Sequence, residues 1–537
     1  MGRQRFFALV FALLAVGSAH GQKLDDAAFL GAIGELREAS YADKASIAQR
    51  LIQSGHPRVR AVLTAVLEDR LAFRNDDNRA FILKSAEGDP VTLIDPLTLK
   101  ESGSVAADSV SKVGTNNTLR RTLRVEVARF SLSSADAATR IQAVREVSQS
   151  LDENTLALLR DRYAVEPDPG VRKEIAVGLA LGALDGEDAG ARLKAVRTLT
   201  GSLSQDVRNR LARVMEEDQD AKVKAAAKAA VAKIDGSRGF YSGIETLFFG
   251  LSLGSVLVLI AIGLAITFGV VGVINMAHGE LMMIGAYTTY MVQTAMPNHI
   301  GISIAVAIPA AFLVSGLIGI LMERCIVRFL YGRPLETLLA TFGVSLILQQ
   351  AVRSIFSALN RSVVTPDWLS GSLRINDALT ITNNRLYIVV FTLIVFSLVV
   401  LALKRTRVGL NIRAVSQNRA MAKAMGIRTE WVDAVTFGLG SGIAGVAGVA
   451  LSQLTNVGPN LGQSYIIDSF VVVVFGGVGN LWGSLIGGLS MGIANKLLEP
   501  YAGAVLSKIL LLIALIFFIQ TRPRGLFPQT GRAAEDK

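Results

Sequence analysis

The chain has 537 residues, of which 51% are hydrophobic and only 18% are charged, and its mean hydropathy is +0.43. These values exclude an ordinary soluble globular protein of this length, so we expect a membrane-embedded portion. The net charge of +11 does not indicate nucleic-acid binding, because the basic excess falls mainly in the apolar half of the chain, as membrane orientation requires. The single cysteine excludes an internal disulfide, and no cofactor or metal pattern is present.

Residues 1–21 have the three parts of a secretory signal peptide. Arg3 and Arg5 supply a basic n-region, residues 6–16 form an apolar core, and small residues follow. The core is too short for a mature membrane-spanning helix, although an uncleaved anchor is an alternative. We therefore expect the next polar stretch, residues 22–240, to be exported to the periplasm.

Residues 22–240 are polar and carry a recurring pattern of an acid or His, a small residue, a basic residue and an apolar helix. This pattern resembles HEAT-like α-helical repeats, in which the Asp caps a helix and the basic residue reaches a neighbouring repeat; unrelated amphipathic helices are the alternative. No catalytic constellation is visible, so a binding or docking role is expected. The basic positions are Arg60, Arg140, Arg172, Arg192 and Lys224.

Two local patterns interrupt this helical domain and a third ends it. Residues 80–101 predict a small β hairpin, and residues 102–117 predict an exposed loop. The boundary DGSRGFYSG (235–243) predicts a linker, in which Gly236, Gly239 and Gly243 end the last soluble helix.

Residues 241–537 predict a multi-span α-helical membrane domain. An odd number of crossings places the C-terminus in the cytoplasm, and the Lys- and Arg-rich loop 404–428 then also lies there, in agreement with the positive-inside rule. Two of the segments, 465–480 and 483–498, could instead form a re-entrant pair. The nine apolar segments lie near 244–270, 273–295, 301–327, 335–356, 386–403, 433–453, 465–480, 483–498 and 504–520.

Small residues at four-residue spacing predict close packing among these helices. They occur in pairs such as Gly438 and Gly442, Ser441 and Gly445, and Ala444 and Gly448. In lipid such spacing lets helix backbones approach each other. It is common in membrane proteins and indicates no particular solute.

The loop at 404–432 is expected to contain a cytoplasmic helix that Ser416 caps and Gly426 ends. Its basic residues and its methionines suit docking against a soluble partner, and a solvated loop that serves only the positive-inside rule is the alternative. The chain has no GxxxxGK[ST] phosphate loop, so ATP would have to act through another polypeptide. The candidate docking residues are Arg413, Ser416, Gln417, Asn418, Arg419, Lys423, Met425 and Gly426.

Polar residues inside the spans are candidates for a solute pathway or a gate, because such groups are costly in hydrocarbon unless they are satisfied. In NMAHGE, Asn275 and His278 would share one face of a helix, with Glu280 two residues further on. Solute contact, helix packing and hinging are all open for these three. Further candidates for the same pathway are Gln349, Gln350, Asn456, Asp468 and Asn480.

Residues 241–537 resemble the permease subunits of branched-chain amino acid ABC transporters, in the order of that family. A signal peptide and a helical domain ahead of the permease, with the stretch TNNTLRR (115–121), resemble the permeases of urea ABC transporters within it. The segments that carry the resemblance are GLAITFGVVGVINMAHGELMMIGAY (263–287), GRPLETLLATFGVSLILQQ (332–350), RVGLNIRAVSQNRAMAKAMGI (407–427), VVVVFGGVGNLWGSLIGG (471–488) and RPRGLFP (522–528).

The resemblance implies a transport subunit in the bacterial inner membrane, surrounded by lipid, and not an enzyme. It implies a second related permease, two cytoplasmic ATPase subunits, and a periplasmic solute-binding protein. Residues 411–427 would be the segment that fits a groove on one of the ATPases. It favours a gating role for Asn275, His278 and Glu280, since family members with different solutes are similar there. The expected solute is urea or a small amide; the alternatives are a branched-chain or other amino acid, a passive urea channel, and a membrane sensor.

Overall fold

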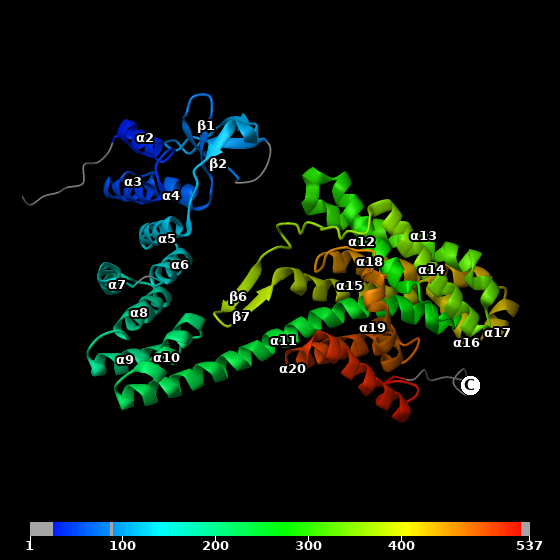
Figure 1. Cartoon of the computed structure of the whole chain (residues 1–537). Helices are drawn as coiled ribbons and strands as arrows, with labels where there is room; N and C mark the ends of the chain where they lie inside the picture. Colours follow the sequence, from blue (N-terminus) through cyan, green and yellow to red (C-terminus); the bar gives the residue numbers. More distant parts are fainter. Residues whose placement is uncertain (1–24, 86–89, 150, 528–537) are drawn as a thin grey trace, which may run out of the picture. The chain divides into compact units, whose positions relative to one another are not determined.

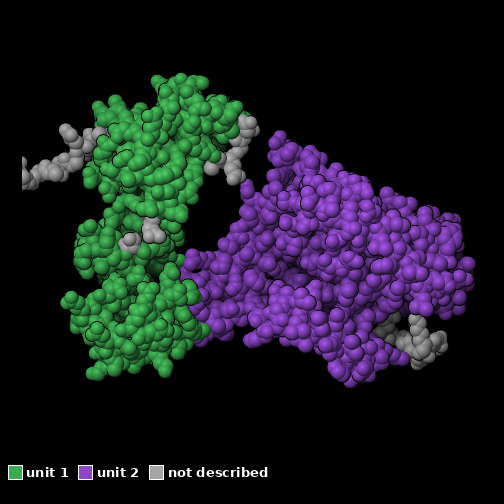
Figure 2. Space-filling model, viewed as in Figure 1, with its two compact units in different colours: residues 1–235 green, residues 236–537 purple. Residues whose placement is uncertain are grey.

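The structure is a computed structural model that describes residues 25–85, 90–149 and 151–527. It divides into two compact units at residue 235 (Figure 2), close to the boundary predicted at residue 240. The predicted signal peptide lies outside the described residues. Each unit has its own hydrophobic core.

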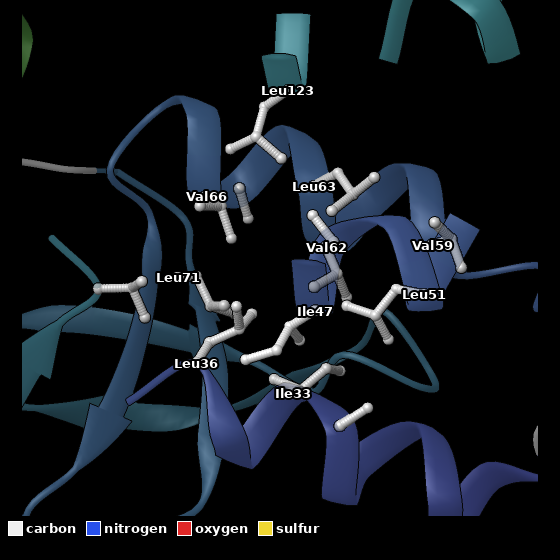
Figure 3. Close-up of a cluster of buried hydrophobic side chains, with 14 of the residues drawn as sticks. Ile33, Leu36, Ile47, Leu51, Val59, Val62, Leu63, Val66, Leu71 and Leu123 are labelled. Atoms are coloured by element: carbon white, nitrogen blue, oxygen red, sulfur yellow. The ribbon is translucent and has the colours of Figure 1, made fainter. Parts of the chain in front are cut away.

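Unit 1 begins with three helices packed against a sheet: α2 (Asp26–Glu35), α3 (Tyr41–Gln53) and α4 (Val59–Leu67). Their apolar faces, together with Leu71 of the sheet and Leu123 of helix α5 (Asn117–Ser131), form the buried cluster shown in Figure 3. Asp25 caps α2 and Ser40 caps α3, each through a side-chain oxygen, which satisfies a backbone N–H that has no partner within the helix.

The hairpin predicted at 80–101 is present, because the strands at 80–83 and 91–94 pair antiparallel, but the prediction of a loop at 102–117 was wrong. The chain forms an antiparallel five-stranded sheet in the order β4-β3-β2-β1-β5. The later strands escaped prediction because β4, with the sequence ESGSV, is exposed and has no alternating apolar pattern. The strands are β1 (Leu71–Arg74), β2 (Ala80–Leu83), β3 (Val91–Ile94), β4 (Glu101–Val105) and β5 (Val110–Lys112).

The remainder of unit 1 is a succession of short helices (Figure 1). Asp136, Asp168 and Asp188 accept backbone N–H bonds at the starts of α6, α8 and α9, as the repeated acids predicted. Arg140 donates to the fully buried Glu166, which follows α7. The helices are α5 (Asn117–Ser131), α6 (Ala137–Val147), α7 (Glu153–Val165), α8 (Pro169–Ala183), α9 (Ala189–Leu199) and α10 (Gln205–Glu217).

The predicted linker at 235–243 is instead helical. Helix α11 runs without interruption over Ala221–Val271 and includes Gly236, Gly239 and Gly243. Each glycine costs a helix about 1 kcal/mol relative to alanine but, unlike proline, does not block its hydrogen bonds. Alanine and lysine before 235 and apolar residues after 243 offset that cost.

Unit 2 consists of long apolar helices. Among the described residues, six helices are long and apolar enough to cross a membrane: α11, α13, α14, α15, α18 and α20. The nine predicted apolar segments fall on these six together with the shorter α12 and α19, because α20 holds two of them, separated at Gly503. The number of crossings stays a prediction. The helices after α11 are α12 (His278–Ala295), α13 (Ile300–Cys325), α14 (Pro334–Phe356), α15 (Asn383–Arg405), α18 (Thr429–Ser452), α19 (Leu461–Gly476) and α20 (Leu481–Thr521).

Helix α18 lies at the centre of unit 2, and small residues let its neighbours approach closely. A Cβ added at Gly285 of α12 would overlap the backbone of Gly445, and one added at Gly448 would overlap the Met282 carbonyl. Gly316 of α13 lies against Gly438 on another side of α18. The close packing predicted from four-residue spacing is present in α18.

A two-stranded hairpin, β6 (Ser372–Asn376) with β7 (Leu379–Thr382), connects α14 to α15.

Candidate functional site

Between α11 and α12 the chain is non-helical over residues 272–277, although both flanking segments are apolar. Gly272 has a φ of +70° and ends α11. Side chains from α14 satisfy the exposed backbone: the Met276 N–H donates to Thr341 Oγ1 at 3.2 Å, and the Thr341 hydroxyl lies 3.4 Å from the Ile274 carbonyl oxygen. Irregular backbone at this depth is stable in a membrane protein only when protein groups satisfy it in this way.

Asn275 does not share a helix face with His278, because Asn275 precedes the helix and His278 begins it. Asn275 is fully buried, and its side-chain oxygen accepts from the Ala277 N–H at 3.0 Å. His278 is also fully buried, with Nε2 at 3.1 Å from the Ile260 carbonyl of α11. The sequence predicted a boundary between the apolar segments 244–270 and 273–295, but the second helix begins only at His278, so Asn275 lies before it.

Glu280, in the first turn of α12, is only 1% exposed and bonds to α14. Its Oε1 accepts from Gln349 Nε2 at 2.8 Å and from the Ser345 hydroxyl at 3.1 Å. Among the described residues its Oε2 has no hydrogen-bond partner. We call Glu280, Thr341, Ser345 and Gln349 the α12–α14 polar interface.

Helix α14 contributes to this interface through a repeat of polar residues that is visible in the sequence but was not used in the prediction. Polar residues recur at every fourth position of α14, which places them on one helix face. Gln349 was selected from the sequence, but Thr337, Thr341 and Ser345 were not, although all three are buried. The members of this face are Thr337, Thr341, Ser345, Gln349 and Arg353.

Gln350 and Asp468 are not part of the α12–α14 polar interface. Gln350 is exposed on another face of α14. Asp468, in α19, accepts from Lys508 of α20 at 2.9 Å. The structure therefore brings together Glu280 and Gln349 from the predicted set and places these two residues elsewhere.

The α12–α14 polar interface can hold two helices together and release them. A buried carboxyl needs donors, and among the residues that the structure describes only Ser345 and Gln349 donate to Glu280. Separating α12 from α14 therefore leaves Glu280 without these bonds unless water or a solute replaces them. No group of His, Cys, Asp and Glu that could hold a metal occurs among the described residues.

The cytoplasmic loop of the sequence analysis forms two short helices, α16 (Arg407–Gln417) and α17 (Arg419–Ala424). The prediction that Ser416 caps one helix was wrong: Ser416 lies in the last turn of α16 and donates to the Arg413 carbonyl at 2.9 Å. Asn418 caps α17 instead, accepting from the Met421 N–H at 2.8 Å. Gly426 follows α17 with a φ of +85°, which is favourable for glycine.

Helix α17 is bound to α18 through Arg419. The Arg419 guanidinium donates to both carboxylate oxygens of Asp433, which is fully buried. By contrast, Met421 and Met425 are 61% and 76% exposed, and Gln417 and Lys423 are exposed as well. Arg419 thus positions α17 while the other side chains are free to meet a partner.

A family model described as the permease component of branched-chain amino acid transport systems matches residues 246–519. The branched-chain amino acid permease LivH of Salmonella typhimurium is 31% identical over 313 residues, which cover 56% of this chain and 99% of LivH. BraD of Pseudomonas aeruginosa is 30% identical, covering 55% and 98%. The ribose import permease RbsC of Escherichia coli is 25% identical, covering 51% and 85%. No solved structure shows significant similarity to the chain.

Proposed function

The chain belongs to the family of permease components of branched-chain amino acid transport systems, and we propose, from the added polar domain that precedes the permease, that it carries urea or a related small amide into the cell. The coarser statement follows from family membership alone. The chain is the permease subunit of an ABC importer, a multi-pass inner-membrane protein and a transport subunit without enzymatic activity of its own.

Two solutes remain candidates, and different observations support them. The names of the relatives, LivH and BraD, directly support a branched-chain amino acid. Urea is supported by unit 1, because 99% of LivH aligns with only 56% of this chain and the matching family model begins at residue 246. The added polar domain is the feature that resembles urea permeases.

The proposed partners are those of an ATP-driven importer. One of two ATPase subunits would dock on α17 and its flanking residues, where Met421, Lys423 and Met425 are exposed and Arg419 anchors the helix to α18. A second related permease would complete the membrane portion. A periplasmic binding protein would deliver the solute, and unit 1, on the same side of the membrane, would assist that delivery.

The α12–α14 polar interface is proposed as a gate. The observation that carries this is Glu280, a carboxyl group that is 1% exposed and whose Oε1 accepts hydrogen bonds from Ser345 and Gln349 of the neighbouring helix α14. When the ATPase subunits move the helices, the hydrogen bonds from Ser345 and Gln349 to Glu280 would form in the closed state and break in the open state. Asn275 and His278 would hold the non-helical segment that allows α12 to move.

The test is uptake into vesicles that contain the purified complex. We expect radiolabelled urea to accumulate only when the vesicles contain ATP and the ATPase subunits are present. Accumulation of leucine and not of urea would establish the amino acid alternative. Equilibration of urea without ATP would identify a passive channel and contradict the proposal.

A further inference from the structure

A second group of charged side chains lies within the apolar helices of unit 2, away from the α12–α14 polar interface. Residues of α11, α19 and α20 line an open cavity of about 180 Å³. This is far above the ~10–15 Å³ that one water needs and below the ~300 Å³ of a pocket for a drug-sized ligand. It therefore suits a solute of few heavy atoms.

The cavity presents two carboxylates and two ammonium groups. Lys508 of α20 donates to Asp468 of α19 at 2.9 Å, and Lys496 donates to Glu499 one turn away on α20. The side chains of all four are partly exposed, between 26% and 46%. Charged groups in membrane helices are expensive, and a partly open set of both signs is typical of a solute or ion pathway.

The backbone at this cavity is also irregular. Helix α20 contains Pro500 and is interrupted at Gly503, whose φ of +77° and ψ of +165° are non-helical. Pro500 has no N–H to donate to the Lys496 carbonyl, so that carbonyl is available as an acceptor. The neighbouring helix α19 is also short, with 16 residues. Short and interrupted helices are the usual sites of solute binding in membrane transporters.

The lining of the cavity combines apolar and polar side chains. Leu253 and Leu257 of α11, Val471 of α19 and Met491 of α20 are apolar, while Tyr465 of α19 and Asn495 of α20 add polar atoms to the four charged groups. A solute with an N–H donor at one end and a carbonyl or carboxylate at the other can therefore bond to both charge signs at once. Urea has this chemistry, and so does the backbone part of an amino acid.

We propose that this cavity is the extracytoplasmic entrance site of the permease, where Asp468 and Glu499 bind the donor groups of the solute and Lys496 and Lys508 bind its acceptor. The inference rests on the proposed importer function. It adds a second site, separate from the gate, and assigns to it three charged residues that the sequence analysis did not select. Its placement outside the cytoplasm follows from α17 and the C-terminus lying in the cytoplasm.

The first experiment measures uptake kinetics of the reconstituted complex with Asp468→Asn and Lys508→Gln, separately for labelled urea and for labelled leucine. We expect KM for the transported solute to rise about ten-fold or more, while the maximal rate stays within about two-fold of the wild-type value. The reason is that the lost contacts bind the solute equally well in the ground state and in the transition state. Ser490→Ala is the matched control on α20, since its hydroxyl bonds only to the backbone of its own helix. Unchanged KM in both variants would overturn the inference.

The second experiment does not require that these variants fold. In a Cys325→Ser background, Asn495→Cys places a thiol in the cavity, and Val505→Cys places one on an outward, 76% exposed position of the same helix. We expect a membrane-impermeant maleimide, added from outside, to label position 495 and the transported solute to slow that labelling, with position 505 unaffected. If neither urea nor leucine slows the labelling at position 495, the entrance site is overturned. If the complex shows no ATP-driven uptake at all, the proposed function is overturned instead.

Discussion

The bond between Gln349 and Glu280 gives the sharpest test of the gate. Gln349→Met keeps the length of the side chain and removes the donor at 2.8 Å from Glu280 Oε1. Hydrogen bonds between membrane helices contribute about 0.6–2 kcal/mol. We expect a value of about 1.5–2 kcal/mol here, because the acceptor is a carboxyl and Glu280 and Gln349 are only 1% and 4% exposed.

At 1.4 kcal/mol per factor of ten, this loss shifts the closed-to-open equilibrium by about 10- to 30-fold. The variant should therefore release preloaded solute from vesicles without ATP at a rate higher by about that factor, and it should import less solute per ATP hydrolysed. The assay is efflux of labelled solute from vesicles that contain equal amounts of inserted protein.

The neighbouring glutamine provides the matched control. Gln350 is exposed on another face of α14, so Gln350→Met makes the same chemical change without touching Glu280. We expect wild-type leak and coupling from this variant. Equal leak from both variants, or wild-type leak from Gln349→Met, would refute the role assigned to the α12–α14 polar interface.

Three further predictions concern other parts of the chain. Combined charge reversal of Arg413, Arg419 and Lys423 should leave the protein inserted but abolish coupled uptake. Asp433→Asn should reduce coupled uptake partially, because it weakens the bond that holds α17 to α18. Wild-type uptake by the charge-reversed variant would contradict the docking role. Deleting residues 22–235 while keeping the predicted signal peptide, residues 1–21, should spare insertion and reduce uptake at limiting solute. Failure of insertion would instead make unit 1 a folding element. Although burial opposes it, the bonds from Arg140 and Arg162 hold the pKa of Glu166 below its ordinary value of 4.5, so unit 1 should keep this stabilisation above pH 4.5 and lose it as the pH falls further. Thermal unfolding of the purified chain between pH 3.5 and 7 should show this loss, with a smaller pH dependence in Arg140→Met.

Much of the membrane half was predictable because backbone N–H and C=O groups in hydrocarbon must bond within their own segment. Long apolar segments were therefore expected to be helical, and the small residues of α18 were expected at close helix contacts. The long α11 was missed because three glycines weaken a helix without ending it. The strands of unit 1 were missed where they are short and exposed, since they show no apolar alternation and the Gly and Ser residues of ESGSV (101–105) are more typical of a loop.

The candidate site was only partly visible in the sequence. Glu280 and Gln349 stood out as polar groups in apolar segments, but their contact joins residues 69 positions apart in the chain, and local spacing carries no information on such a pair. The polar face of α14, repeating at every fourth residue from Thr337, was readable and was overlooked. Asp468 and Lys508 were likewise 40 positions apart, so the cavity between their helices required the fold.

The arrangement of the chain across the membrane tests the account most directly, since import requires α17 to meet an ATPase in the cytoplasm while unit 1 lies outside. A reporter that is active only in the cytoplasm can be fused after residue 418, beside α17, and in a second chain after residue 200, within unit 1. We expect activity from the first fusion and none from the second. Activity at 200 with silence at 418 would contradict the account.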